Sequence, residues 1–208
     1  MKRLFILLLL PLFFACKDKM RKAGHIQLEA VIYNDPTGDL YDSELFEISD
    51  LYFVGSHFLE KVPYHNDSLN IPNFAYVSNG KFKIGNSLEE LKNNSSFQEI
   101  SEKKFGALFQ TPAVPNYDIR VPMSDTAFNG YNYKRLKIAN DSAYTVFYIH
   151  QTDILLPFSL APQFDKEYKG VLNRIDTYDK INDRFVSLRM TVTDTIPKTM
   201  YDLLKAKQ

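Results

Sequence analysis

The chain has 208 residues, with 25 basic and 25 acidic side chains, a formal net charge of zero and 45% hydrophobic residues. This length allows one domain with a sizeable core, and the balanced charge excludes the strong positive field that attracts nucleic acid. The single cysteine excludes a disulfide within the chain, so the fold must be stabilised by its core.

The first sixteen residues have the pattern of an export signal. Lys2 and Arg3 precede an apolar run of eleven residues at 4–14, and Ala15 and Cys16 follow this run. A membrane-spanning helix needs about 20 apolar residues, so a run this short is typical of a signal peptide. We therefore expect three regions, which are a signal peptide at 1–15, a tether at 16–24 and a single globular domain at 25–208.

The segment Phe13-Phe14-Ala15-Cys16 resembles the cleavage box of bacterial lipoproteins, in a looser form that is similar to that of the Bacteroidota. In that family the cysteine becomes the lipidated first residue, so the resemblance implies palmitate on Cys16. The next residues, Lys17-Asp18-Lys19, are similar to the tag that sends such lipoproteins to the cell surface. The resemblance implies a lipid-anchored protein of the cell envelope, in the outer membrane, on either the periplasmic or the surface face.

Four triplets of Asp, then Ser or Thr, then a small or aliphatic residue are similar to the O-glycosylation sites of the same lineage. The candidate acceptors are Ser68, Thr126, Ser142 and Thr195. The alternative is local backbone chemistry, because Asp-Ser and Asp-Thr pairs are common in turns and helix caps.

The tether at 16–24 is short, polar and basic. This composition is typical of a solvated linker. The alternative is that its basic side chains contact anionic headgroups.

Beyond the tether, alternating apolar and polar residues predict a series of strands. In chain order they cover 25–33, 51–59, 74–77, 82–84, 117–121, 133–138, 144–150, 168–178 and 184–193. The last has the clearest pattern, because Val186, Leu188 and Met190 alternate with polar residues and give it one buried and one wet face. The connections are too short for crossover helices, so we expect mainly antiparallel pairing.

Two helices are predicted beside the strands. Ser87 and Glu90 form a capping box, which indicates a helix from about Leu88 towards Asn94 that resumes at Phe97. Pro197 in a first turn predicts a short helix at the C-terminus. The fold class is therefore α+β and β-rich, either a sandwich or a curled sheet, with a few short helices.

The sequence predicts no catalytic residue and no cofactor, because it contains no nucleophile elbow, phosphate loop or zinc-protease motif. Ser56 and His57 are adjacent, but neighbours in a strand point to opposite faces and cannot form a nucleophile and base pair. This favours a non-enzymatic protein.

Two groups of side chains invite metal-site hypotheses, and neither has a recognised ligand spacing. The groups are His57, His65 and Asp67 for zinc, and Asp35, Asp39, Asp42 and Glu44 for calcium. We interpret the first as surface residues and the second as an ordinary turn, and predict no metal site.

The chain is rich in Tyr and Phe but has no Trp. Tyr131 with Tyr133, or Tyr144 with Tyr148, are candidates for a sugar-stacking platform, although packing explains such rings more simply.

Two hypotheses for function remain. The first is an envelope lipoprotein that binds a protein partner or assembles with one, with its ligand unknown. The alternative is a glycan-handling accessory or hydrolase with two carboxylates 5–9.5 Å apart in a cleft, which is roughly the spacing that glycoside hydrolysis uses.

Overall fold

The computed structural model describes residues 19–34, 43–62, 73–99, 107 and 114–206. The strands are β1 (Lys19–Met20), β2 (Ala23–Tyr33), β3 (Ser43–Val54), β4 (His57–Lys61), β5 (Phe74–Ser78), β6 (Lys81–Gly85), β7 (Gln98–Glu99), β8 (Val121–Phe128), β9 (Tyr131–Ala139), β10 (Ala143–Gln151), β11 (Ile154–Leu155), β12 (Gly170–Asp179) and β13 (Arg184–Thr193). The helices are α1 (Leu88–Asn93), α2 (Pro162–Tyr168) and α3 (Lys198–Lys205). No helix in the described part of the chain is long and apolar enough to span a membrane.

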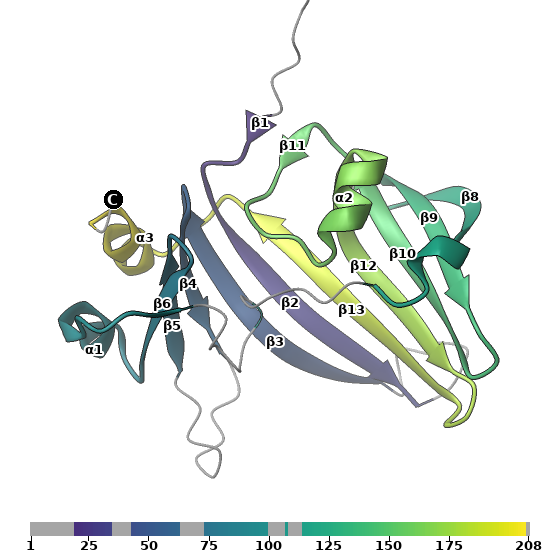
Figure 1. Ribbon diagram of the computed structural model, residues 1–208, viewed down its shortest axis with the longest axis horizontal. Helices are drawn as coiled ribbons and strands as arrows, with labels where there is room; N and C mark the ends of the chain where they lie inside the picture. The colour runs from purple at the N-terminus through teal and green to yellow at the C-terminus, as the bar shows by residue number, and fades with distance from the viewer. Residues whose placement is uncertain (1–18, 35–42, 63–72, 100–106, 108–113, 207–208) are drawn as a thin grey trace, which may run out of the picture.

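Eleven strands form one antiparallel sheet, in the spatial order β7-β6-β5-β4-β3-β2-β13-β12-β10-β9-β8. The first and last long strands, β2 and β13, therefore lie side by side in the middle of the sheet. The sheet is open, with β7 and β8 at its edges, and Figure 1 shows it curving strongly between β3 and β6. Strands β1 and β11 form a separate parallel pair beside it.

Successive residues of the central strands enter different cores, because side chains alternate between the two faces of a sheet. Leu51 and Phe53 of β3 pack with Ile26 of β2 on one face. Tyr52 packs on the other face with a cluster that includes Leu203 of α3. The curved sheet is thus covered by apolar contacts on both sides of β3.

Helix α2 covers the part of the sheet that β10 and β12 form (Figure 1). Its Phe164 is fully buried, with ring centroids 4.5 Å from Phe147 and 4.9 Å from Tyr117. Arg120 ties the helix to the segment before β8, because it forms an ion pair with Glu167. The helix is therefore fixed by an aromatic cluster and by an ion pair at its edge.

The predicted β-rich α+β class, with mainly antiparallel pairing and a C-terminal helix, is confirmed. The sandwich alternative is not confirmed, because the large sheet is single and curved. The hairpin of β5 and β6 turns at Asn79 and Gly80, with φ of 51° and 74°, as expected for an Asn-Gly turn. Helix α1 begins after Ser87, whose Oγ accepts the Glu90 N–H at 3.1 Å.

Several local predictions are wrong. The predicted strand at 51–59 is the end of β3 and the start of β4, which meet at a turn with Gly55 at a φ of 61°. The predicted strand at 117–121 is a 3-10 turn over Tyr117–Ile119 followed by β8. The helix of 88–94 does not resume at Phe97, because β7 begins at Gln98. Helix α2 was not predicted, since its seven residues make only about two turns and carry little periodic signal.

The ordered strands begin inside the predicted tether. Lys19 and Met20 pair with β11, and β2 starts at Ala23. The Arg21 N–H donates to the Leu155 carbonyl at 2.9 Å, which fastens this segment to the domain. The division at 15/16 and 24/25 stays a prediction.

The buried position of Phe164 gives a test of the fold. Replacing Phe164 with Ala leaves a cavity between α2 and the sheet, and such changes cost about 3–5 kcal/mol of unfolding free energy. Ile181→Ala is the control, because Ile181 is 76% exposed and its loss should change stability by less than about 0.5 kcal/mol. Urea unfolding followed by circular dichroism measures both; similar midpoints for the two variants would contradict this packing.

Candidate functional site

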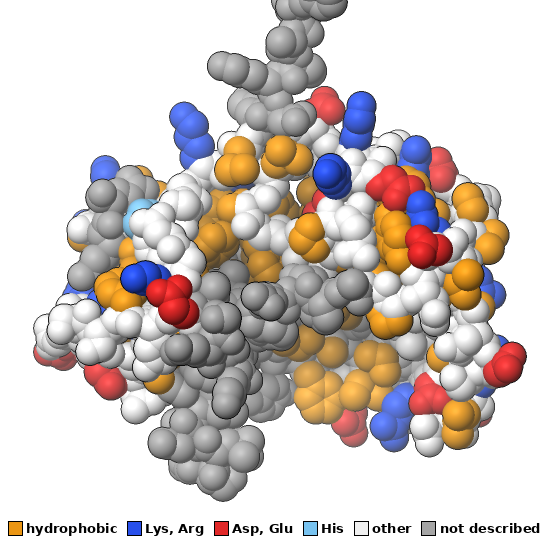
Figure 2. Space-filling model, viewed as in Figure 1, with side chains coloured by type: hydrophobic (Ala, Val, Ile, Leu, Met, Phe, Trp, Pro, Cys, Tyr) orange, Lys and Arg blue, Asp and Glu red, His pale blue; other side chains and the backbone are white. Residues whose placement is uncertain are grey.

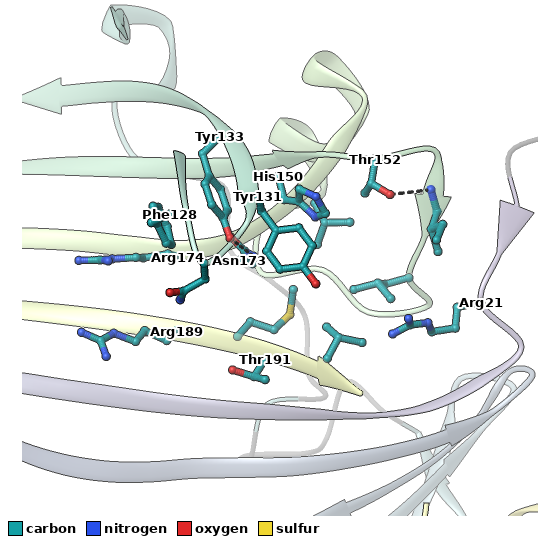
Figure 3. A pocket seen from close by; sticks show the side chains of 16 residues that line it. Arg21, Phe128, Tyr131, Tyr133, His150, Thr152, Asn173, Arg174, Arg189 and Thr191 are labelled. Atoms are coloured by element: carbon teal, nitrogen blue, oxygen red, sulfur yellow. Dashed lines mark hydrogen bonds between the residues drawn. The ribbon is translucent and has the colours of Figure 1, made fainter. Parts of the chain in front are cut away.

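A cavity lies where β12 and β13 separate. Their ladder runs from Asp179↔Arg184 to Arg174↔Arg189 and stops there. Beyond that pair, residues 170–172 stay paired with β10, and residues 190–193 stay paired with β2. The opening between the strand ends holds a cavity of about 520 Å³ (Figure 3). Because residues from the ends of both strands line it, the cavity is formed by the sheet itself.

A β-bulge in β12 places two consecutive polar residues in this cavity. The β10–β12 register moves from Tyr148↔Arg174 to Ile149↔Leu172, so Asn173 has no partner in β10. Both Asn173 and Arg174 line the cavity, although neighbours in a regular strand point to opposite faces. The bulge thus redirects a side chain towards the site, as bulges often do.

The base of the cavity carries two arginines directly opposite each other, Arg174 and Arg189. Like charges in this arrangement repel. Arg174 is compensated by Asp176, which is only 3% exposed and lies 2.8 Å from its Nε. Arg189 donates instead to two neutral groups, the Tyr33 hydroxyl at 2.6 Å and the Ser187 Oγ at 3.2 Å.

The charge of the cavity wall is therefore positive. Within the described residues, no carboxylate lies within 4 Å of the Arg189 guanidinium, and the third lining arginine, Arg21, pairs with Asp194 at 3.2 Å. None of the sixteen described lining residues is Asp or Glu. Such a wall favours an anionic group on whatever binds there.

Asn173 presents a buried hydrogen-bond acceptor. Its Nδ2 lies 3.5 Å from the Tyr133 hydroxyl, whereas its Oδ1 has no partner among the described residues. A buried polar atom without a hydrogen-bond partner lowers the stability of the fold by about 1–3 kcal/mol. A ligand that donates a hydrogen bond to Asn173 Oδ1 would remove that cost.

Aromatic rings form one wall. Phe128 and Tyr131 flank the β8–β9 turn, where Asn129 and Gly130 have φ of 51° and 78°. Phe128 stacks on Tyr133 at 4.0 Å between centroids. Tyr131 is 53% exposed and lies at the front of the cavity in Figure 3. Its ring makes a T-shaped contact with the ring of His150, with 4.7 Å between the centroids.

The opposite wall is aliphatic. Leu156, Val171, Met190 and Val192 line the cavity and also belong to, or pack against, the core beside β2. A ligand in this cavity therefore touches a positive base, an aromatic wall and an aliphatic wall. This combination suits an amphipathic molecule.

None of the candidate modification sites in the described part of the chain lines this cavity. Cys16 and Ser68 lie outside the described residues. Thr126 lies on β8, Ser142 in the β9–β10 turn and Thr195 after β13. The Oγ of Ser142 donates to the Asn140 side chain at 3.0 Å, which is the turn chemistry named as the alternative to a sugar.

The other sequence candidates also lie apart. Ser56 is exposed in the β3–β4 turn, and the His57 Nδ1 pairs with the Tyr76 hydroxyl at 2.7 Å. Within the described residues no three His, Cys, Asp or Glu side chains gather as a metal site. Glu44 is exposed on β3, and the remaining acids and histidines of the two metal hypotheses lie outside the described part.

Sequence reasoning named the aromatic wall but missed the base of the cavity. Tyr131 and Tyr133 were candidates for a stacking platform, and both line the cavity. Arg174, Arg189 and Asn173 were not identified. A signal was present, since Asn173 and Arg174 place two polar residues in succession in an otherwise apolar stretch of β12.

His150 gives a prediction for pH dependence. Burial at the cavity wall lowers the pKa of His150 below the usual value of 6.5. In the window between the lowered pKa and 6.5 the unfolded chain binds more protons, so the stability of the fold falls as the pH is lowered through this window. We expect His150→Gln to lose less stability between pH 7 and pH 5 than the wild type does. Urea midpoints at both pH values measure this; an identical loss in the two proteins would contradict it.

No known protein family matches the chain, and no curated protein matches it either. Among crystal structures, it is similar to a domain from Vibrio parahaemolyticus described as outer membrane lipoprotein-sorting, with 12% identity, 91% of this chain and 93% of that chain covered, and a TM-score of 0.27. It is also similar to a DUF1329 family protein from Desulfovibrio piger, with 7% identity, coverage of 90% and 92%, and a TM-score of 0.28. At TM-scores this low the similarity does not establish a shared fold, and no function follows from it.

Proposed function

We propose that this protein is a lipid-anchored envelope protein that binds an anionic amphipathic ligand in the cavity between β12 and β13, without transforming it. One observation carries the proposal. The base of the cavity holds a guanidinium, that of Arg189, with no acidic partner within 4 Å among the described residues. Its register partner on β2 is Glu29, which forms no ion pair with it, so this guanidinium favours an anion from outside the chain.

The remaining features of the cavity fit the same ligand. A volume of about 520 Å³ lies within the range of small-molecule sites, which are mostly apolar with a few polar groups that fix orientation. Arginine matches the planar geometry of carboxylates and the tetrahedral oxygens of phosphates and sulfonates. The free Asn173 Oδ1 adds a contact for a hydroxyl or amide near the charged end.

The hydrolase alternative has no support at this cavity. Glycoside hydrolysis uses a pair of carboxylates, and the described lining residues supply none. The neutral imidazole of His150 has Tyr131 and Tyr133 as its ring neighbours rather than a carboxylate. The arrangement therefore supports binding more than catalysis.

The lipid anchor in this proposal is supported by the sequence. The signal-peptide pattern and the position of Cys16 support attachment to the outer membrane through palmitate and further acyl chains on Cys16. A protein partner in the envelope, either periplasmic or at the surface, would receive or deliver the ligand.

A matched pair of fluorescent probes tests the cavity. The anionic probe is 1-anilinonaphthalene-8-sulfonate, and N-phenyl-1-naphthylamine is the same ring system without the sulfonate. We expect wild-type protein to bind the sulfonate more tightly. Arg189→Gln should weaken sulfonate binding about tenfold or more, because hydrogen bonds to charged groups contribute about 1.5–3 kcal/mol, and should leave the uncharged probe almost unaffected.

Arg184→Gln is the control for total charge, because Arg184 is exposed at the other end of β13. Circular dichroism establishes that each variant is folded. Equal affinity of wild-type protein for the two probes, or sulfonate binding that survives in Arg189→Gln, would contradict the proposal.

A separate experiment tests the anchor. We expect Cys16→Ala to move the protein from the membrane fraction to the soluble fraction, and mass spectrometry of the wild-type N-terminus to find acyl chains on Cys16. Lys205→Ala, at an exposed position of α3, serves as the control that keeps the cysteine. An unmodified Cys16 in the mature protein would rule the anchor out.

A further inference from the structure

The chain enters the domain at one edge, next to the cavity. Met20 pairs with Leu155 in the β1–β11 ladder, and Lys19 pairs with Ile154. Arg21 and Ile154 line the ligand cavity. Cys16 lies only three residues before Lys19, and an extended chain spans at most about 3.6 Å per residue. A lipid on Cys16 would therefore hold this edge within about 11 Å of the acyl chains.

Large apolar side chains stand exposed at the same edge. Met20 is 56% exposed and Ile154 is 41% exposed, and Tyr131 is 53% exposed at the mouth of the cavity. Single exposed apolar residues are normal on a protein surface. Here Ile154 and Tyr131 share the lining of one cavity. Met20 lies one register pair further along the β1–β11 ladder, on its other side, and lines a neighbouring cavity, so exposed apolar side chains stand on both sides of this ladder.

Basic side chains surround these residues. A second cavity of about 650 Å³ is lined by Met20, Leu155, Lys166 and Lys169, and both lysines are exposed. Lys22 is also exposed and directly follows the β1 segment. Figure 2 shows basic, hydrophobic and a few acidic side chains along the upper border of the molecule, where Figure 1 places β1 and β11.

Acidic groups offset part of this charge. Asp153 and Asp165 line the second cavity together with Lys166 and Lys169, and the exposed Lys22 leaves a small excess of basic side chains at this edge. Each lysine near an anionic membrane contributes about 1 kcal/mol of attraction. The edge thus combines exposed apolar side chains with exposed lysines, as interfacial membrane contacts do.

We propose that this edge, which we call the anchor edge (Met20, Lys22, Ile154 and Lys169), lies on an anionic phospholipid bilayer, with Met20 and Ile154 among the headgroups. The proposal rests on the lipid anchor proposed above. In this orientation the ligand cavity opens beside the membrane. An amphipathic ligand then passes between bilayer and cavity without crossing bulk water.

Site-specific fluorescence tests the orientation on the whole lipidated protein. Acylation blocks the thiol of Cys16, so Met20→Cys introduces one reactive thiol for a polarity-sensitive fluorophore. The protein is reconstituted into vesicles of phosphatidylcholine and phosphatidylglycerol, with and without lipids that carry a quencher at the headgroup level. We expect a blue shift and quenching at position 20.

Ile181→Cys is the matched control, because Ile181 is an exposed apolar residue in the β12–β13 hairpin, at the end of the sheet opposite to β1 (Figure 1). Its fluorophore should keep the emission seen in water. We also expect the quenching at position 20 to fall in a Lys22→Gln, Lys169→Gln double variant.

The outcomes separate the two proposals. Protein that floats with the vesicles but carries an unquenched fluorophore at position 20 would overturn the orientation and leave the anchor intact. Protein that does not float at all would overturn the anchor and the orientation with it. Equal quenching at positions 20 and 181 would also overturn the orientation.

Discussion

Arg174 and Arg189 face each other in the last register pair that joins β12 to β13. Two guanidinium groups in this position repel, and the buried Asp176 offsets only one of them. The strands diverge at this point, and each strand end remains bound to its outer neighbour. The cavity and its positive base follow from the place where this ladder ends, and the β-bulge of β12 at the same point brings the free oxygen of Asn173 to it.

The position of β2 and β13 has consequences for folding. These strands are the first and last of the long strands, and they pair in the centre of the sheet. Each half of the sheet is built from strands that follow one another in the chain, and only the central β2–β13 ladder joins distant residues. Folding with such distant contacts is slow, and the centre of the sheet forms only after β13 is available.

Sequence reasoning succeeded where the signal is local. The short strands predicted at 74–77 and 82–84 and the alternation in β13 each belong to a short stretch of chain, and both were identified correctly. The single strand predicted at 51–59 is wrong because the chain reverses direction at the tight turn of Gly55. Hydrophobic periodicity alone does not reveal such a turn.

The candidate site could be predicted only in part. Tyr131 and Tyr133 attract attention as aromatic residues next to Asn129-Gly130. The pairing of Arg174 with Arg189 depends on the register between two strands, and the position of Asn173 in the cavity wall depends on a bulge. Register and bulges are set by the whole sheet, and one strand's sequence does not reveal them.

The β1–β11 pair would also limit how far the domain can stand from the proposed anchor. Within the described chain, two register pairs and the bonds of Arg21 hold β1, so a pull on Cys16 would act first on this short ladder. Release of β1 would lengthen the span from Cys16 to the start of β2 at Ala23 to at most about 25 Å. With a lipid on Cys16, the short parallel pair would then act as a spacer with two lengths, which would keep the cavity close to the bilayer while paired and let the domain reach outward under load.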